Sequence, residues 1–306
     1  MRASLRSLSC LVFTGAVIGG VLAAGPATVA GAATTTCSGT PGAPGVLSGT
    51  VTCKGSLSSP GVLVGTINSN VVVKGLCAVP AGPAVVAGNV TVSPGSVLAA
   101  VFALHHSSLT VKGNIYVRAG AVALLGCNPA NSPCMDAPKL SSHLTVGLDL
   151  RSNQALGVVV HNFSVGGDVI QTGGGGGRNC TPQGIFKAFG SPVFSAYEVG
   201  TVGGDVRISS VQSCWMGVVQ LQVGNTVVFH FNKLADPDAI EILANNITGN
   251  LICRGNSRVW NSSETRPPPH LFPRDPQPNT VGRNRKGQCV LSSPTKPGGQ
   301  PGPGPF

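Results

Sequence analysis

Residues 165–170, Val-Gly-Gly-Asp-Val-Ile, and residues 202–208, Val-Gly-Gly-Asp-Val-Arg-Ile, are two copies of the unit that decides the fold. In each copy a valine-rich strand leads into glycine and then Asp168 or Asp205, and a second alternating strand follows directly. The unit recurs with Asn in place of Asp, at Asn89, Asn114 and Asn250. Recurrence of one strand–corner–strand unit is typical of a solenoid, in which each repeat packs on its neighbours.

The unit has a direct physical interpretation. Alternation such as that of Val90 and Val92 points one set of side chains inward. Glycine followed by Asn or Asp tolerates the backbone angles of a sharp corner. The 25 residues from Gly88 to Gly113 fit one turn of a parallel β-helix with three short faces, so we expect coils of this length. The Asn and Asp residues of the repeats are then expected to stack near one corner.

Longer intervals between repeats are interpreted as loops inserted into the coil, where solenoids accommodate insertions. They contain the segments 127–134, 173–180 and 214–241. The alternative fold is an antiparallel β-sandwich, which also has many short strands separated by turns. A sandwich does not need Gly-Asn or Gly-Asp between like strands, so the repeat favours an all-β, parallel β-helix with loop insertions.

The chain is expected to divide into three parts. Residues 1–33 are a predicted signal peptide, because two arginines precede an apolar run that is too short to span a bilayer. Residues 34–263 are the predicted β-helix domain. Residues 264–306 form a predicted proline-rich basic tail, expected to be disordered and partly tethered by a disulfide. No transmembrane segment is expected in the mature chain.

Nine cysteines follow the predicted leader, and an exported chain is expected to oxidise them to disulfides. Because nine is odd, one thiol is expected to be left over or paired between chains. The expected disulfides are one pair among Cys37, Cys53 and Cys77, followed by Cys127 with Cys134, Cys180 with Cys214, and Cys253 with Cys289.

The formal net charge of +10 is concentrated toward the C-terminus. Eight Lys and Arg residues lie from Arg254 onward, against Glu264 and Asp275, so the body is expected to be close to neutral. The tail lacks the aromatic residues that alternate with cations in single-strand binders. Nucleic acid is therefore not an expected partner.

A motif near the C-terminus resembles that of a known group of proteins. It reads Gly-Asn-Leu-x-Cys-x-Gly-Asn over residues 249–256, then Pro-Asn-x-Val over 278–281 and Gly-Gln-Cys over 287–289. This signature resembles that of secreted, repetitive β-rich proteins of high-GC Gram-positive bacteria, a group with no established activity. The resemblance implies an exported β-rich chain and assigns no functional residue.

Asp168 and Asp205, together with Arg207 and His161, are the candidates for a polar binding patch on one corner. Clustered carboxylates with a nearby cation are the groups that β-helical polysaccharide-cleaving enzymes use. The exchange of Asp for Asn at equivalent repeat positions favours a role in turns, because Asn replaces Asp well in a turn and poorly as a general base. No catalytic residue, metal site or cofactor is predicted.

These observations predict a non-catalytic structural or matrix protein that is secreted or held at the cell surface. The basic tail makes anionic cell-wall polymer a candidate partner, and the repetitive body makes self-association another. The alternative function is a carbohydrate-active β-helix enzyme or a glycan-binding solenoid. Two Trp and two Tyr in the whole chain count against glycan binding on aromatic platforms.

Overall fold

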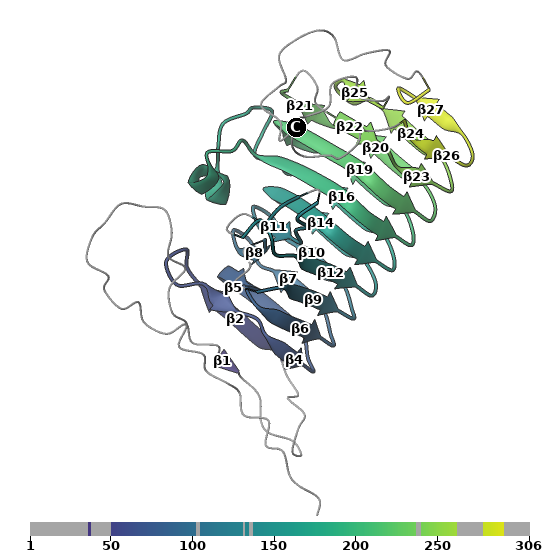
Figure 1. The fold of residues 1–306 in the computed structure, drawn as a ribbon. Helices are drawn as coiled ribbons and strands as arrows, with labels where there is room; N and C mark the ends of the chain where they lie inside the picture. Colours follow the sequence, from purple (N-terminus) through teal and green to yellow (C-terminus); the bar gives the residue numbers. More distant parts are fainter. Residues whose placement is uncertain are drawn as a thin grey trace, which may run out of the picture.

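The computed structural model describes residues 36–37, 50–101, 105–130, 132–134, 137–236, 240–261 and 278–290. These residues form a three-sided parallel β-helix, with the strands of successive coils stacked in register along one axis (Figure 1). The predicted fold class is confirmed. The alternative of an antiparallel sandwich is wrong, because the strand pairings beyond the first are parallel. The predicted signal peptide, residues 1–33, lies outside the described residues.

Each coil contributes a strand to three faces, which we call A, B and C in chain order. Face A consists of β2 (Val51–Gly55), β5 (Val71–Ala78), β7 (Val90–Val92), β10 (Ile115–Val117), β13 (Leu150–Asn153), β15 (Val169–Thr172), β17 (Val206–Ser209), β20 (Val227–His230), β24 (Leu251–Arg254) and β27 (Arg285–Gly287). Face B consists of β3 (Gly61–Val62), the end of β5, β8 (Val97–Ala100), β11 (Val122–Leu125), β14 (Gly157–Val165), β16 (Phe194–Val202), β19 (Trp215–Val223), β22 (Ile240–Leu243) and β25 (Val259–Trp260). Face C consists of β4 (Gly65–Ile67), β6 (Gly82–Val86), β9 (Ser107–Val111), β12 (Ser142–Val146), the second halves of β14, β16 and β19, β23 (Asn246–Ile247) and β26 (Thr280–Val281).

Short elements lie outside the three faces. β1 (Thr36–Cys37) pairs antiparallel with β2, and β18 (Gln212–Ser213) pairs with β21 (Lys233–Leu234). A 3-10 helix, η1 (Gly184–Phe189), lies beside the solenoid (Figure 1). No helix among the described residues has the length and apolar character needed to cross a membrane.

The shortest coils are 19 residues long, as from Asn70 to Asn89. The predicted length of 25 residues describes the coil from Asn89 to Asn114, but it overstates the basic repeat. That coil carries an extra segment between β8 and β9, whereas two coils of 35 and 37 residues carry longer insertions. The solenoid therefore tolerates insertions while its strands stay in register.

The predicted stack of Asn and Asp residues is confirmed at the corner between faces C and A. The main-chain N–H of each member donates to the side-chain oxygen of the member one coil earlier, over 2.7 to 3.3 Å. We call this row the corner ladder. Its members are Asn70, Asn89, Asn114, Asp149, Asp168, Asp205, Thr226, Asn250 and Asn284. The ladder starts every strand of face A from β5 onward at the same height, and this fixes which residues point outward.

The corner ladder predicts opposite results for two substitutions of Asp168. Asp168→Asn should change the free energy of unfolding by less than about 0.5 kcal/mol, since an amide oxygen replaces the acceptor. Asp168→Ala should cost about 1–3 kcal/mol, because the partly buried N–H of Asp205 loses its acceptor. Urea unfolding of both variants measures the difference. Equal losses in the two variants would mean that the negative charge, rather than the acceptor, stabilises this corner.

The largest insertion, residues 173–193, covers part of face B. It begins with five consecutive glycines, Gly173–Gly177, all with positive φ between 63° and 96°. It then packs Phe186 and Val193 against Trp215 in a second hydrophobic cluster outside the main core. This cluster leaves faces A and C as the open faces of the solenoid.

The last turn of the solenoid extends into the region predicted as a tail. Residues 278–290 contain β26 and β27, which pair with β23 and β24. Arg285 occupies the inward position of face A and donates a hydrogen bond to the Asn279 carbonyl, at 2.7 Å. The predicted end of the β-helix domain at residue 263 is therefore too early. Residues 278–290 pair with β23 and β24 although their composition is polar and includes proline.

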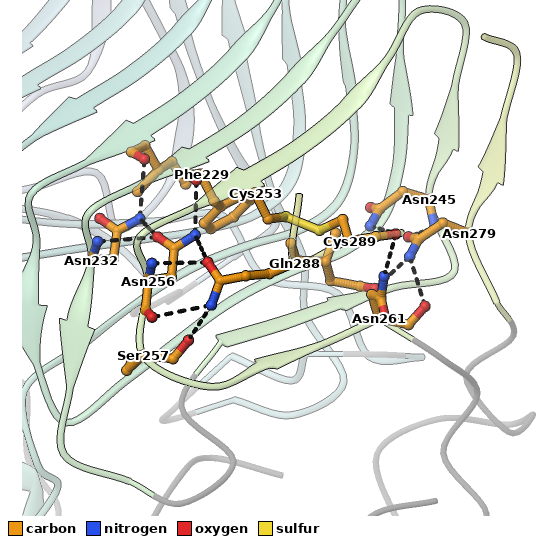
Figure 2. Close-up of a disulfide and its surroundings, with 12 residues drawn as sticks. Phe229, Asn232, Asn245, Cys253, Asn256, Ser257, Asn261, Asn279, Gln288 and Cys289 are labelled. Carbon is orange, nitrogen blue, oxygen red and sulfur yellow. Dashed lines mark hydrogen bonds between the residues drawn. A yellow bond between two sulfur atoms is a disulfide. The ribbon is translucent and has the colours of Figure 1, made fainter. Parts of the chain in front are cut away.

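Amide side chains, all buried except that of Gln288, hold this last turn, as Figure 2 shows. Asn256 accepts from the main-chain N–H of Asn232, and Gln288 accepts from that of Asn256, at 3.1 and 2.9 Å. At the next corner Asn279 accepts from the N–H of Asn245, at 3.1 Å. The two amide rows repeat the principle of the corner ladder inside the core.

Four disulfides cross-link the described residues. The three local pairs expected from the sequence, Cys127–Cys134, Cys180–Cys214 and Cys253–Cys289, are confirmed. The fourth joins Cys53 to Cys77, which lie on neighbouring coils. Cys37, an alternative partner in the prediction, is not part of this pair. Disulfides of this number are typical of oxidising compartments outside the cytosol.

Candidate functional site

Face A presents a row of cations to its outer surface. The corner ladder sets the phase of each strand, so side chains two and four positions after a ladder residue point outward. Cations occupy these positions along the length of the solenoid. They are Lys54, Lys74, Arg118, Arg151, Arg207, Arg254 and Lys286, and all are exposed. Neighbouring parallel strands lie about 4.8 Å apart, so the cations follow one another along the face, with gaps at β7, β15 and β20, which contribute no outward Lys or Arg.

Two of these cations are paired with the corner ladder. Arg151 contacts the Asp149 carboxylate at 2.6 Å, and Arg207 forms an ion pair with Asp205. Among the described residues, Lys54, Lys74 and Arg254 have no carboxylate partner. Face A therefore retains a net positive charge after its own ion pairs are counted.

The other two faces differ in charge. The outward column of face C contains only uncharged side chains, namely Thr66, Val85, Thr110, Thr145, Ser164, Thr201, Gln222, Asn246 and Thr280. On face B the acidic residues Glu198 and Glu241 are buried. The near-neutral charge predicted for the body thus hides a local difference, because face A carries seven exposed Lys and Arg residues and this column of face C carries none.

The middle of face A contains a tyrosine ring at an outward position, that of Tyr116 on β10. The Arg118 guanidinium lies 5.1 Å from the ring centroid, within the range of a cation–π contact. Arg151 occupies the neighbouring position on β13. A hollow of about 370 Å³ on one side is lined by Tyr116, Asp149 and Arg151, and a second of about 450 Å³ is lined by Arg118 and Asn153 among others. We call this group the Tyr116 site.

The electrostatics of the Tyr116 site involve the pKa of Asp149. Burial favours the neutral acid, but the hydrogen bond from the Asp168 N–H and the contact with Arg151 together outweigh it. The pKa of Asp149 therefore lies below its ordinary range. The carboxylate stays charged under any mildly acidic condition.

This lowered pKa predicts how one substitution alters the dependence of stability on pH. A carboxyl whose pKa is lower in the folded state stabilises the fold above its unfolded pKa, and this contribution is lost as pH falls through the folded pKa. Asp149→Asn keeps the ladder acceptor and removes the titration. The stability difference between wild type and Asp149→Asn should thus be constant above about pH 5 and shrink below about pH 4. Urea unfolding at several pH values measures it, and a constant difference down to pH 2 would contradict the assignment.

The four residues predicted as a binding patch are only partly brought together. Asp168 and Asp205 are successive members of the corner ladder, with the Asp205 N–H 2.8 Å from the Asp168 Oδ1 atom. Arg207 pairs with Asp205. His161 lies instead on β14 of the other side of the coil, with its Nε2 atom 3.4 Å from the buried Glu198 carboxylate. The prediction that His161 belongs to this corner is wrong, since the face C part of β14 separates His161 from Asp168.

The residues that the sequence analysis missed are Tyr116, Arg118, Arg151 and the lysines of face A. A signal for them exists in the sequence. Cations recur two or four positions after the ladder residue, as in Asn114-x-Tyr-x-Arg and Asp149-x-Arg. Counting from the corner motif, instead of searching for clustered charge, would have identified the basic face.

The geometry of face A is suited to binding rather than to proton transfer. The ladder carboxylates each hold a main-chain N–H with one oxygen, and two of them hold an arginine with the other. Within the described part of the chain, no three His, Cys, Asp or Glu side chains gather as metal ligands. The chain matches no protein-family model, no curated protein and no solved structure.

Proposed function

We propose that this protein is a non-catalytic, secreted scaffold that binds a linear anionic polymer of the cell surface along face A. The observation that carries the proposal is the row of exposed cations on that face. A flat array of fixed charges attracts a polyanion more strongly than it attracts a small anion, because successive charges of one polymer bind together.

The rigidity of the scaffold supports this proposal. The three rows of hydrogen-bonded side chains and four disulfides hold the coils in one register. Cations on such a frame are held at fixed separations, so the polymer loses little affinity to ordering of the protein. The disulfides and the predicted signal peptide support placement outside the cytosol.

Catalysis is the less favoured function. The candidate carboxylates Asp168 and Asp205 serve as turn acceptors, and Asp205 is also paired with Arg207. A glycosidase needs one carboxyl to give up a proton and a second to act as base or nucleophile. Ladder residues committed to main-chain N–H groups are poorly placed for either role.

The proposal is tested by titrating the full mature chain with a linear polyanion and with neutral dextran of similar length. Binding to the polyanion should weaken steeply as the salt concentration rises from 50 to 300 mM, because exposed charges are screened over about 6–14 Å in that range. Dextran should not bind. Equal binding of dextran, or cleavage of either polymer, would refute a non-catalytic polyanion-binding function.

A further inference from the structure

We propose that the Tyr116 site recognises a sugar carrying a carboxylate, so that the polymer bound by face A is a polyuronate rather than a polyphosphate. This inference rests on the proposed function and adds the chemical class of the bound unit. It is argued from the three kinds of group that meet at the site, which are an aromatic ring, arginine and a carboxylate acceptor.

The aromatic ring supplies the surface that a sugar needs. Tyr116 is half-buried, although it lies at an outward position between Thr91 and Arg151. The ring therefore stands on the sheet with part of its surface open to the hollows beside it. The C–H faces of sugar rings pack on such surfaces, whereas a phosphate has no apolar face to offer.

Arg151 retains donors for a carboxylate. Its Nε and Nη2 atoms both donate to the Asp149 Oδ2 atom, at 3.0 and 2.6 Å. A guanidinium has five N–H groups in a fixed fork, so the side held by Asp149 orients the plane and the remaining donors are available. Planar two-point binding of a carboxylate is the arrangement that arginine favours.

Asp149 retains acceptor capacity for sugar hydroxyls. Its Oδ1 atom accepts the Asp168 N–H at 2.7 Å, and its Oδ2 atom accepts from Arg151. A carboxylate has about four lone-pair sites, and three of them are used here, so the Oδ1 atom can accept one further hydrogen bond. A sugar hydroxyl donates to such an oxygen, but an ionised unit inside a polyphosphate chain has no proton to donate.

The wall of the hollow has no room for side chains. An added Cβ at Gly147 or Gly166 would lie 2.3 or 2.4 Å from a carbonyl oxygen of the preceding coil. Leu148, which is 52% exposed, also lines the hollow and contributes apolar surface. The hollow next to Tyr116 thus combines an apolar wall with a charged end, as an acidic sugar requires.

The test compares two polyanions with the same number of charges per chain, polygalacturonate and linear polyphosphate, on the full mature chain. Tyr116→Ala should weaken polygalacturonate binding about 5- to 10-fold, the usual value of one aromatic contact. It should change polyphosphate binding less than about twofold, since phosphate gains only from charge. Phe231→Ala, which removes an aromatic side chain 62% exposed at a different corner, is the matched control.

The outcomes separate this inference from the proposed function. Polygalacturonate binding that weakens in Tyr116→Ala and survives in Phe231→Ala supports the uronate site. Equal affinity for both polyanions, with no effect of Tyr116→Ala on either, would overturn the uronate site and leave the basic face intact. No binding of either polyanion by the wild-type chain would overturn both. Circular dichroism of Tyr116→Ala, together with its retained polyphosphate binding, shows that the variant is folded.

Discussion

Replacement of Lys54, Lys74 and Arg254 together by glutamine should lower the affinity for a linear polyanion by about two orders of magnitude. Each cation near an anionic surface contributes about 1 kcal/mol, and each 1.4 kcal/mol is a tenfold change in affinity. These three side chains are exposed on face A and have no carboxylate partner among the described residues. Their removal thus takes away attraction without leaving a buried charge unpaired. Isothermal titration at 50 mM salt measures the loss.

A matched variant separates the position of the charges from their number. Lys139, Lys187 and Arg258 are exposed and lie off face A, on insertions and on the segment before β25. Replacing these three by glutamine gives the same net charge as the first variant. The affinity should fall less than about threefold, because these charges lie outside the outer surface of face A and salt screens their attraction for a polymer bound there. Similar losses in both variants would mean that total charge, and not face A, governs binding.

The corner motif shows why the repeat could be predicted from the sequence. Glycine precedes the ladder residue in five of the nine coils, and at these glycines a Cβ would collide with the preceding coil, so the choice recurs often enough to be recognised. Gly88-Asn89 and Gly167-Asp168 therefore mark equivalent points although the residues between them differ. Local chemistry of this kind is visible in one sequence. The corner motif predicted the fold class and the stack of Asn and Asp residues. The positions of the cysteines along the chain predicted the three local disulfides.

The alternation of apolar and polar residues along the strands does not predict every buried residue of the core. Gln171 lies at an inward position of β15 and is fully buried. It accepts a hydrogen bond from the Tyr197 hydroxyl at 2.9 Å and donates to the Ser195 hydroxyl at 3.0 Å. Burial raises the pKa of Tyr197, so the phenol remains a donor. These partners come from two faces of one coil and are separated by the insertion 173–193, so no spacing in the sequence brings them together.

The basic face could be predicted only in part, for a related reason. Which side of a strand faces outward depends on where the corner begins, and the corner is visible in the sequence. Which charges remain unpaired depends on side-chain contacts along each strand, such as the ion pairs of Arg151 with Asp149 and of Arg207 with Asp205. The insertions also change the coil length from 19 to 37 residues. Distance along the chain therefore says little about distance along face A.

The disulfide at the C-terminal end should have the largest effect on stability. In the chain-entropy account, a cross-link stabilises by restricting the unfolded chain, more so for a longer loop. Cys253 and Cys289 are 36 residues apart, and Cys127 and Cys134 are 7 apart. The same account gives about 4 kcal/mol for the first and about 2.5 kcal/mol for the second. Replacing each pair by alanine compares the two, with urea unfolding as the measurement.

The strands that lose hydrogen-exchange protection when the Cys253–Cys289 disulfide is removed should show whether it stabilises the last turn or the whole solenoid. Cys289 is fully buried, and its carbonyl accepts a hydrogen bond from the Asn261 side chain, at 3.0 Å (Figure 2). Without the Cys253 bond, residues 278–290 stay attached through β26, β27 and the amide rows alone. Hydrogen exchange should therefore quicken first in these strands, while β10 and β13 keep their protection. A uniform loss of protection along all coils would mean that this disulfide stabilises the solenoid as one cooperative unit, because all coils then unfold together.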